Sequence, residues 1–252
     1  MRRKFWRLLM AVSVILIVLS VYQLYKIYSE YGEAAGEYES LKSYVRSADN
    51  RLDEEADDDD DEKWDIDFDS LRKINPDIVG WLYMPACDIS YPIVQSDNNS
   101  DYLGTTFEKT KNKSGAIFMD CECNADFSDF NTIIYGHNMK NGTMFGALKK
   151  LYQEANLRSS NPYFFIIGTD NHADRYEIFS YYIDKSLSNG FVLTNTEEEN
   201  RSYISKAMSK TIENTGVEVS PEDKIVTLAT CSGRAGGNKR FFVHGKKIVR
   251  KK

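Results

Sequence analysis

Ile225-Val226-Thr227-Leu228-Ala229-Thr230-Cys231 is the stretch from which we infer the fold, because its short apolar run predicts a buried strand. A second run begins at Arg240, beyond a loop of small residues at 233–238. Two strands joined by such a loop should lie antiparallel, which would place Arg240 level with Cys231. Alternation along the strand puts Cys231 on the face of Thr227 and Ala229, whose small side chains would leave room for a substrate.

Six further runs along the chain have strand character, and three segments have helical character. Closely spaced strands separated by turn signals predict a mainly β fold with about eight short strands in a closed or nearly closed barrel. The short linkers leave few crossover helices, which argues against a doubly wound parallel sheet. The expected strands are 79–85, 89–95, 114–120, 131–135, 163–168, 176–183, 224–231 and 240–249, and the expected helices are 69–76, 144–155 and 197–214.

The N-terminal segment is apolar from Phe5 to Tyr25, which is 21 residues and about the length that crosses a bilayer core. Four cations precede or begin this stretch and only Lys26 follows it closely, so we expect the N-terminus to stay inside. The alternative is a cleaved signal peptide, but bulky residues rather than small ones follow the apolar core. We therefore expect a single-pass membrane anchor over residues 1–28.

Residues 29–63 are polar and strongly acidic, with nine carboxylates among the ten residues 53–62. Such a run repels itself and cannot bury apolar surface, so we expect an extended extracellular stalk. A Ca²⁺ site is the alternative, although the run lacks the spacing and the glycine of an EF-hand loop. Residues 1–63 hold 9 of the 32 basic and 14 of the 38 acidic residues, so the folded part, residues 64–252, is nearly neutral. Its charge gives no argument for nucleic-acid binding.

The four cysteines are Cys87, Cys121, Cys123 and Cys231. A disulfide from Cys87 to Cys121 or Cys123 stays open for an exported domain, although a domain of this size does not need one. Their spacing does not suggest zinc, and we find no metal or nucleotide site, so no cofactor is expected.

Cys231 at a strand end is a candidate nucleophile, and the alternative is an inert buried thiol. A thiol needs a base or a cationic environment to attack a carbonyl. His137 ends the strand 131–135 in Tyr135-Gly136-His137-Asn138, where its ring could enter a cleft, and we expect it to be the general acid/base. His172 lies in a polar turn, and for His244 we expect packing or hydrogen bonding.

An acyl-transfer intermediate also needs a partner for its oxyanion. Arg stays charged at any working pH and presents a planar fork of donors, so Arg240 is the expected partner. Arg234, on the loop itself, is its competitor.

These features together resemble the sortases, the cysteine transpeptidases of Gram-positive cell surfaces. The resemblance rests on the membrane anchor, on Tyr135-Gly136-His137-Asn138, on Thr227-Leu228-Ala229-Thr230-Cys231 and on Arg240. Residues 74–82, residues 133–139 and the expected helix 197–214 are similar to class B members. The resemblance covers nearly all of residues 64–252. The chain departs from many family members in the segment after Cys231. Many members have an acidic or aromatic residue soon after the cysteine, whereas residues 232–237 of this chain are unusually small.

The resemblance implies an eight-stranded sortase-type barrel with inserted and N-terminal helices, and a catalytic domain over residues 64–252. It implies that Cys231 is the nucleophile, His137 the acid/base and Arg240 the oxyanion or positioning group. Asn99 and Leu103 match a segment of the family that lines the substrate groove. The resemblance likewise implies that Thr230 contacts the substrate.

The implied reaction cleaves a sorting signal of the Asn-Pro-x-Thr type after Thr and transfers the exported protein to an amine of a peptidoglycan precursor. Three alternatives stay open: pilus polymerisation on a pilin amine, hydrolysis with water as the acceptor, and a non-catalytic surface barrel that binds peptides. The enzyme would lie at the cell membrane with its catalytic domain outside.

Overall fold

Eight strands close into one barrel in the part of the chain that the computed structural model describes: residues 2–46, 64–154, 157, 161–185, 193–194, 196–232 and 239–249. Around the barrel they follow the order β1-β2-β3-β4-β7-β8-β6-β5. This arrangement confirms the expected mainly β, closed-barrel fold. The strands are β1 (Ile78–Met84), β2 (Ile89–Val94), β3 (Ile117–Met119), β4 (Asn131–Tyr135), β5 (Tyr163–Gly168), β6 (Ala173–Lys185), β7 (Ile225–Ser232) and β8 (Lys239–Lys247).

Two parallel pairings, β2 with β3 and β4 with β7, interrupt an otherwise antiparallel barrel. In the second pairing Tyr135 lies opposite Ala229, so β4 and β7 end at the same edge of the barrel. β7 and β8 are antiparallel, and the main chain of Cys231 lies opposite that of Arg240, as the sequence predicts. Three segments distant in sequence therefore meet at one edge.

Alternation along the strands divides the core into two clusters. The main cluster includes Val226, Leu228 and Val243. Phe242 and Ala229 belong to a second cluster, on the face that α5 (Glu197–Lys210) covers. α5 begins at a capping box of Thr196 and Glu199, and it is shorter than the helix expected over residues 197–214.

The segment expected as a helix over residues 144–155 is mainly a 3₁₀ turn, η4 (Phe145–Lys149), followed by the short α3 (Lys150–Gln153). Its buried side chains Phe145, Leu148 and Leu151 are spaced by three residues, which is the repeat of a 3₁₀ helix. β3 is also shorter than the expected strand 114–120, because Gly115 takes a left-handed conformation with φ +58°.

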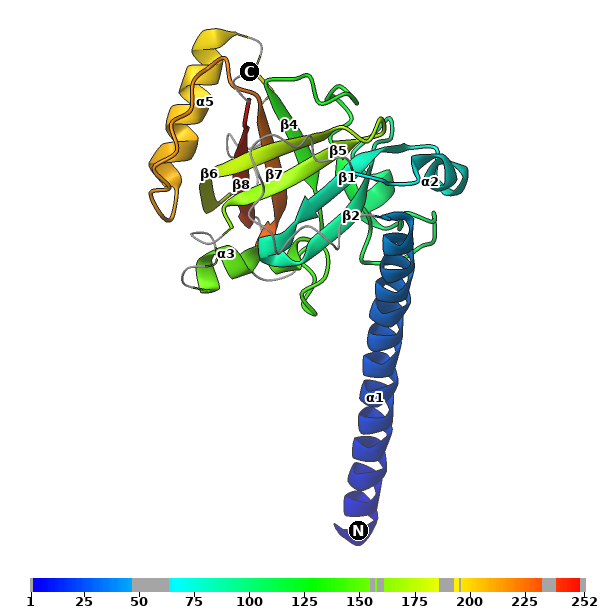
Figure 1. Ribbon diagram of the computed structural model, residues 1–252. Helices are drawn as coiled ribbons and strands as arrows, with labels where there is room; N and C mark the ends of the chain where they lie inside the picture. Colours follow the sequence, from blue (N-terminus) through cyan, green and yellow to red (C-terminus); the bar gives the residue numbers. More distant parts are fainter. Residues whose placement is uncertain are drawn as a thin grey trace.

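The N-terminal helix α1 (Arg2–Leu41) is continuous and projects from the barrel (Figure 1). It is long and apolar enough to cross a membrane. Its last turns pack against the barrel, where Ala34, Tyr38 and Leu41 are buried. The structure therefore differs from an extended stalk in its first part, whereas the acidic run 53–62 lies outside the described residues.

A short helix precedes β1 in the chain. α2 (Phe68–Ile74) is capped by the Asp67 carboxylate, which accepts from the Ser70 main-chain N–H, and it ends at Asn75. Figure 1 shows α2 beside the end of the barrel where α1 docks.

Candidate active site

A cavity of about 210 Å³ lies at the edge where β4 and β7 end. Five of the six expected site residues line it: Asn99, Leu103, His137, Thr230 and Arg240. The sixth, Cys231, follows Thr230 directly in β7, and its side chain lies outside the described part of the structure. Arg234 also lies outside the described residues. The strand pairing thus gathers into one cleft residues that are more than 130 positions apart in the chain.

Gly136 turns the chain at the end of β4 and allows His137 to enter the cleft. Its N–H donates to the carbonyl oxygen of Ala229 in β7, at 3.2 Å. A Cβ at this position would lie 2.5 Å from Ile117 Cδ1 and 2.7 Å from Phe145 Cγ, so no other residue fits without displacement of the core.

The ring of His137 is oriented by a main-chain carbonyl: its Nε2 lies 2.7 Å from the oxygen of Leu103. A carbonyl oxygen only accepts hydrogen bonds, so this contact requires the proton on Nε2. Nδ1 is then the nitrogen that can take up a proton from a reacting group. The contact fixes the orientation of the ring in the cleft.

Asn99 is held by Asp120, a residue that the sequence reasoning missed. The Asn99 Nδ2 donates to Asp120 Oδ2 at 3.0 Å, and its Oδ1 accepts from the Cys121 N–H at 2.9 Å. The Tyr135 hydroxyl donates to the same carboxylate oxygen at 2.6 Å. Burial, followed by this hydrogen bond, raises the pKa of Tyr135 above its usual value. Tyr135 was visible as the first residue of the Tyr-Gly-His-Asn motif, whereas no sequence signal pointed to Asp120.

On the β7 side the space expected beside Thr227 is filled, because α5 places the Tyr203 hydroxyl 3.0 Å from the Thr227 Oγ1. Ala229, the other small residue expected to leave room, does line the cleft, and Thr230 lines it as well. Thr230 is 4 % exposed, and within the described part of the chain its hydroxyl has no hydrogen-bond partner. A buried hydroxyl of this kind favours a ligand that can bond to it.

Arg240 is the second residue of β8 and is partly exposed at the rim of the cleft. Its Nη1 donates to the main-chain oxygen of Lys239 at 3.0 Å. The guanidinium keeps its charge at any working pH, so it supplies a fixed positive charge beside the end of β7.

The other histidines lie away from the cleft. The His172 side chain is 70 % exposed and lies 3.4 Å from Asp174. His244 is fully buried beneath α5 and bonds to Thr227 at 2.9 Å, which is the packing and hydrogen-bonding position expected for it.

The three cysteines whose side chains are described, Cys87, Cys121 and Cys123, are free thiols, so they form no disulfide with one another. Burial raises the pKa of Cys87 and of Cys123 to about 12. Neither of these buried thiols suits nucleophilic chemistry.

Known proteins match both the sequence and the barrel. A family model for the sortase domain matches residues 82–248. Sortase B of Listeria monocytogenes is 35 % identical over 185 residues, which cover 71 % of this chain and 73 % of that protein. Sortase B of Staphylococcus aureus is 32 % identical over 187 residues, covering 73 % of this chain and 75 % of that protein. The crystal structure of sortase B from Bacillus anthracis superposes with a TM-score of 0.72 at 30 % identity, covering 89 % of this chain and all of that one.

Proposed function

Since the chain belongs to the sortase family, as a class B cysteine transpeptidase that acts on sorting signals and cell-wall precursors, we propose that its reaction runs through Cys231, His137 and Arg240. The single observation that supports this assignment is the cleft at the ends of β4 and β7. Its lining includes His137 and Arg240, and the main chain of Cys231 lies directly opposite Arg240 in the strand ladder.

In the first half-reaction the thiol of Cys231 passes its proton to Nδ1 of His137, and the resulting thiolate attacks the carbonyl carbon of the Thr in the sorting signal. A C–S bond forms, the peptide C–N bond breaks, and His137 gives its proton to the leaving amine. Nδ1 is the nitrogen that transfers this proton, because Nε2 is engaged by the Leu103 oxygen.

In the second half-reaction an amine of a cell-wall precursor attacks the thioester. His137 takes the proton of the attacking amine and the new C–N bond forms. The C–S bond then breaks, and the departing thiolate of Cys231 takes that proton back from His137. Amines open thioesters readily, so the intermediate suits transfer. Water in place of the amine gives hydrolysis, which we propose as a side reaction.

Both tetrahedral intermediates carry an oxyanion that a fixed positive charge stabilises. Arg240 supplies this charge from the rim of the cleft, and the hydroxyl of Thr230, which has no partner among the described residues, supplies a hydrogen bond to the bound signal. Asn99 and Leu103 also line the cleft, where Asn99 is held by Asp120 and Leu103 is 47 % exposed. This pair of residues suits a signal of the Asn-Pro-x-Thr type, with a polar and an apolar contact.

We further propose that α1 anchors the enzyme in the cell membrane, with the N-terminus inside and the barrel outside. The apolar part of the helix is exposed along its length, from Phe5 to Tyr28, so in this structure it has no protein surface to cover it. Arg3, Lys4 and Arg7 lie before or at the start of that part, which favours an inside N-terminus.

The test uses the full chain in detergent, incubated with a library of sorting-signal peptides and a set of amines that includes a peptidoglycan-type diamine and a pilin-type Lys peptide. Mass spectrometry of the products identifies the acyl-enzyme and the ligated peptides. We expect ligation in the wild type, no thioester in Cys231→Ala, and no turnover in His137→Ala. Unchanged turnover in Cys231→Ala would exclude this mechanism.

The same products separate the alternatives. Ligation to the Lys peptide alone would favour pilus polymerisation, and hydrolysis without ligation to any amine would favour a protease. Peptide binding without any covalent product would favour a non-catalytic barrel.

A further inference from the structure

Tyr102 and Leu103 are neighbours that point to opposite sides of the cleft wall. Leu103 is 47 % exposed and lines the cleft, whereas Tyr102 is 3 % exposed and reaches back into the protein. They lie in the 3₁₀ turn η3 (Asp101–Leu103). A single turn of this kind has little stability of its own, so its position depends on what holds Tyr102.

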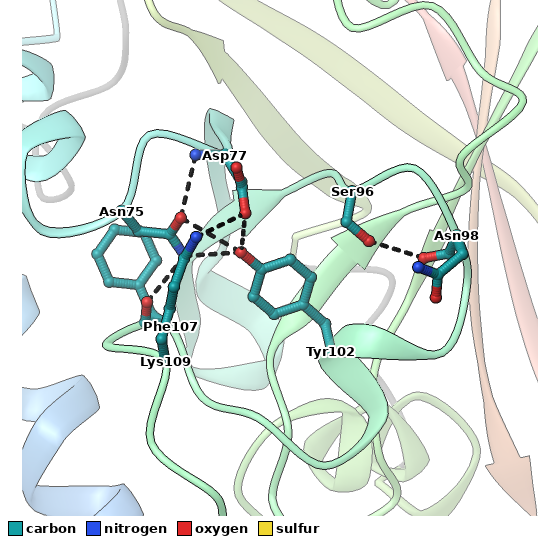
Figure 2. Close-up of polar contacts among 7 residues, drawn as sticks. All are labelled: Asn75, Asp77, Ser96, Asn98, Tyr102, Phe107 and Lys109. Atoms are coloured by element: carbon teal, nitrogen blue, oxygen red, sulfur yellow. Dashed lines mark hydrogen bonds and ion pairs between the residues drawn. The ribbon is translucent and has the colours of Figure 1, made fainter.

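The Tyr102 hydroxyl is held by the segment between α2 and β1 (Figure 2). It donates to Asp77 Oδ2 at 2.5 Å, and it accepts from the Asn75 Nδ2 at 2.9 Å. The Asp77 carboxylate also pairs with the Lys109 ammonium at 3.1 Å. Hydrogen bonds to a charged group are among the stronger ones in proteins, so this hydroxyl is firmly fixed.

Asn75 is itself rigid. It is fully buried, its Oδ1 accepts from the Asp77 N–H at 3.0 Å, and its Nδ2 also donates to the Phe107 oxygen at 2.8 Å. The α2–β1 connection therefore contacts the segment that carries Leu103 at Tyr102, at Phe107 and at Lys109. These three contacts fall within the eight residues 102–109, so they hold the turn η3 in one position.

The wall in turn fixes the catalytic ring. The Leu103 oxygen lies 2.7 Å from His137 Nε2, and the Tyr102 oxygen accepts from the Ala116 N–H at 3.0 Å. Gly115, next to Ala116, packs against the same ring: a Cβ there would lie 3.0 Å from His137 Cδ2. A shift of Tyr102 would therefore be transmitted to the His137 ring through the next carbonyl.

We propose that Tyr102 is a positioning residue for the reaction, held by Asn75 and Asp77, and that it fixes the ring orientation and the tautomer of His137 through the Leu103 carbonyl. Asn75 and Asp77 lie before residue 82, where the match to the sortase domain begins. The proposal rests on the proposed role of His137 as the acid/base, and it adds to that role a support outside the cleft.

The test is Tyr102→Phe in the full chain, with two readouts. Nitrogen NMR of the histidine rings, without substrate, reports the tautomer of His137, whose signals are assigned by their loss in His137→Gln. We expect the Nε2–H tautomer in the wild type and a mixture of tautomers in Tyr102→Phe. In the peptide-ligation assay we expect kcat to fall about 10- to 100-fold with KM little changed, the loss that a misplaced catalytic group produces.

Tyr181→Phe is the matched control. Tyr181 is also buried, at 1 % exposed, and its hydroxyl also donates to a carboxylate, that of Glu213 at 2.8 Å. It should lose stability as Tyr102→Phe does and keep the tautomer of His137. An unchanged tautomer in Tyr102→Phe would overturn the proposal, even with lowered activity. If the wild type itself fails to ligate, the proposed function fails, while the NMR measurement still decides the role of Tyr102.

Discussion

The Nδ1 atom of His244 lies 2.9 Å from the hydroxyl oxygen of Thr227, in the interface between the barrel and α5. Thr227 donates its own proton to Asn131 Oδ1 at 2.6 Å, so the His244 ring carries its proton on Nδ1. Within the described residues Nε2 has no hydrogen-bond partner. The ring of His244 lies among aromatic side chains, including Phe242, which stacks on it. The neutral ring fits this site, and a second proton would have no acceptor.

This environment predicts a loss of stability in acid. Burial lowers the pKa of His244 to about 3, from an ordinary value near 6.5. Below pH 6.5 the unfolded chain binds a proton that the folded chain refuses, so stability falls as the pH drops from 6.5 towards 3. One such proton contributes a slope of up to about 1.4 kcal/mol per pH unit.

Urea unfolding of the wild type and of His244→Asn between pH 7 and pH 4 measures this contribution. We expect the free energy of unfolding to fall less steeply in the variant. His172→Asn, at an exposed histidine, should keep the wild-type slope. Parallel slopes for the wild type and His244→Asn would contradict the prediction.

Gly136→Ala should destabilise the barrel and impair the site together. The added methyl group would lie 2.5 Å from Ile117 Cδ1 and 2.7 Å from Phe145 Cγ, so the core must shift. Overpacking of this kind costs about 1–3 kcal/mol, and here the strain lies next to His137. Thermal unfolding and the ligation assay measure the two effects. Gly104→Ala is the control, because nothing lies within 4 Å of its added Cβ, and equal behaviour of the two variants would refute the steric argument.

Tyr38→Phe should loosen the docking of α1 on the barrel. The buried Tyr38 hydroxyl donates to the Gly115 oxygen at 2.7 Å and accepts from the Phe107 N–H at 3.2 Å. The variant leaves this buried carbonyl and N–H unpaired, which costs about 1–3 kcal/mol. Denaturant unfolding of the full chain in detergent measures the loss. Tyr28→Phe, at an exposed position of the same helix, should unfold as the wild type does.

Alkylation of the native protein should spare two of the four cysteines. The pKa of Cys87 and of Cys123 is raised to about 12 by burial, so at pH 8 these thiols carry almost no thiolate. Iodoacetamide treatment followed by peptide mass spectrometry should leave both unmodified in the folded state and modify them after unfolding in urea. Rapid modification of native Cys87, which is fully buried, would show that the core near it opens.

Parts of this structure could be predicted from local sequence and others could not. Short apolar runs gave nearly correct limits for β7 and for β4, because a strand buried on both faces is apolar or small along most of its length. The helix expected over 144–155 was right only in part: residues 145–149 form a 3₁₀ turn and residues 150–153 an α-helix, since the three-residue spacing of the apolar side chains also suits a 3₁₀ turn. Asp120 was missed because its partners Asn99 and Tyr135 lie 21 and 15 residues away, so no local pattern records the contact.

The order of the residues by itself determined the set of strands, the apolar N-terminal helix, and the placement of Cys231, His137 and Arg240 at strand ends. These features follow from side-chain periodicity and turn chemistry, which act over a few residues. Only the tertiary structure decided that β4 lies parallel to β7, that Tyr203 rather than a substrate covers Thr227, and that the hydroxyls of Tyr102 and Tyr38 bond to Asp77 and to Gly115. Pairings between distant segments depend on the burial and hydrogen bonding of the whole chain, so they cannot be inferred from any short stretch of the sequence.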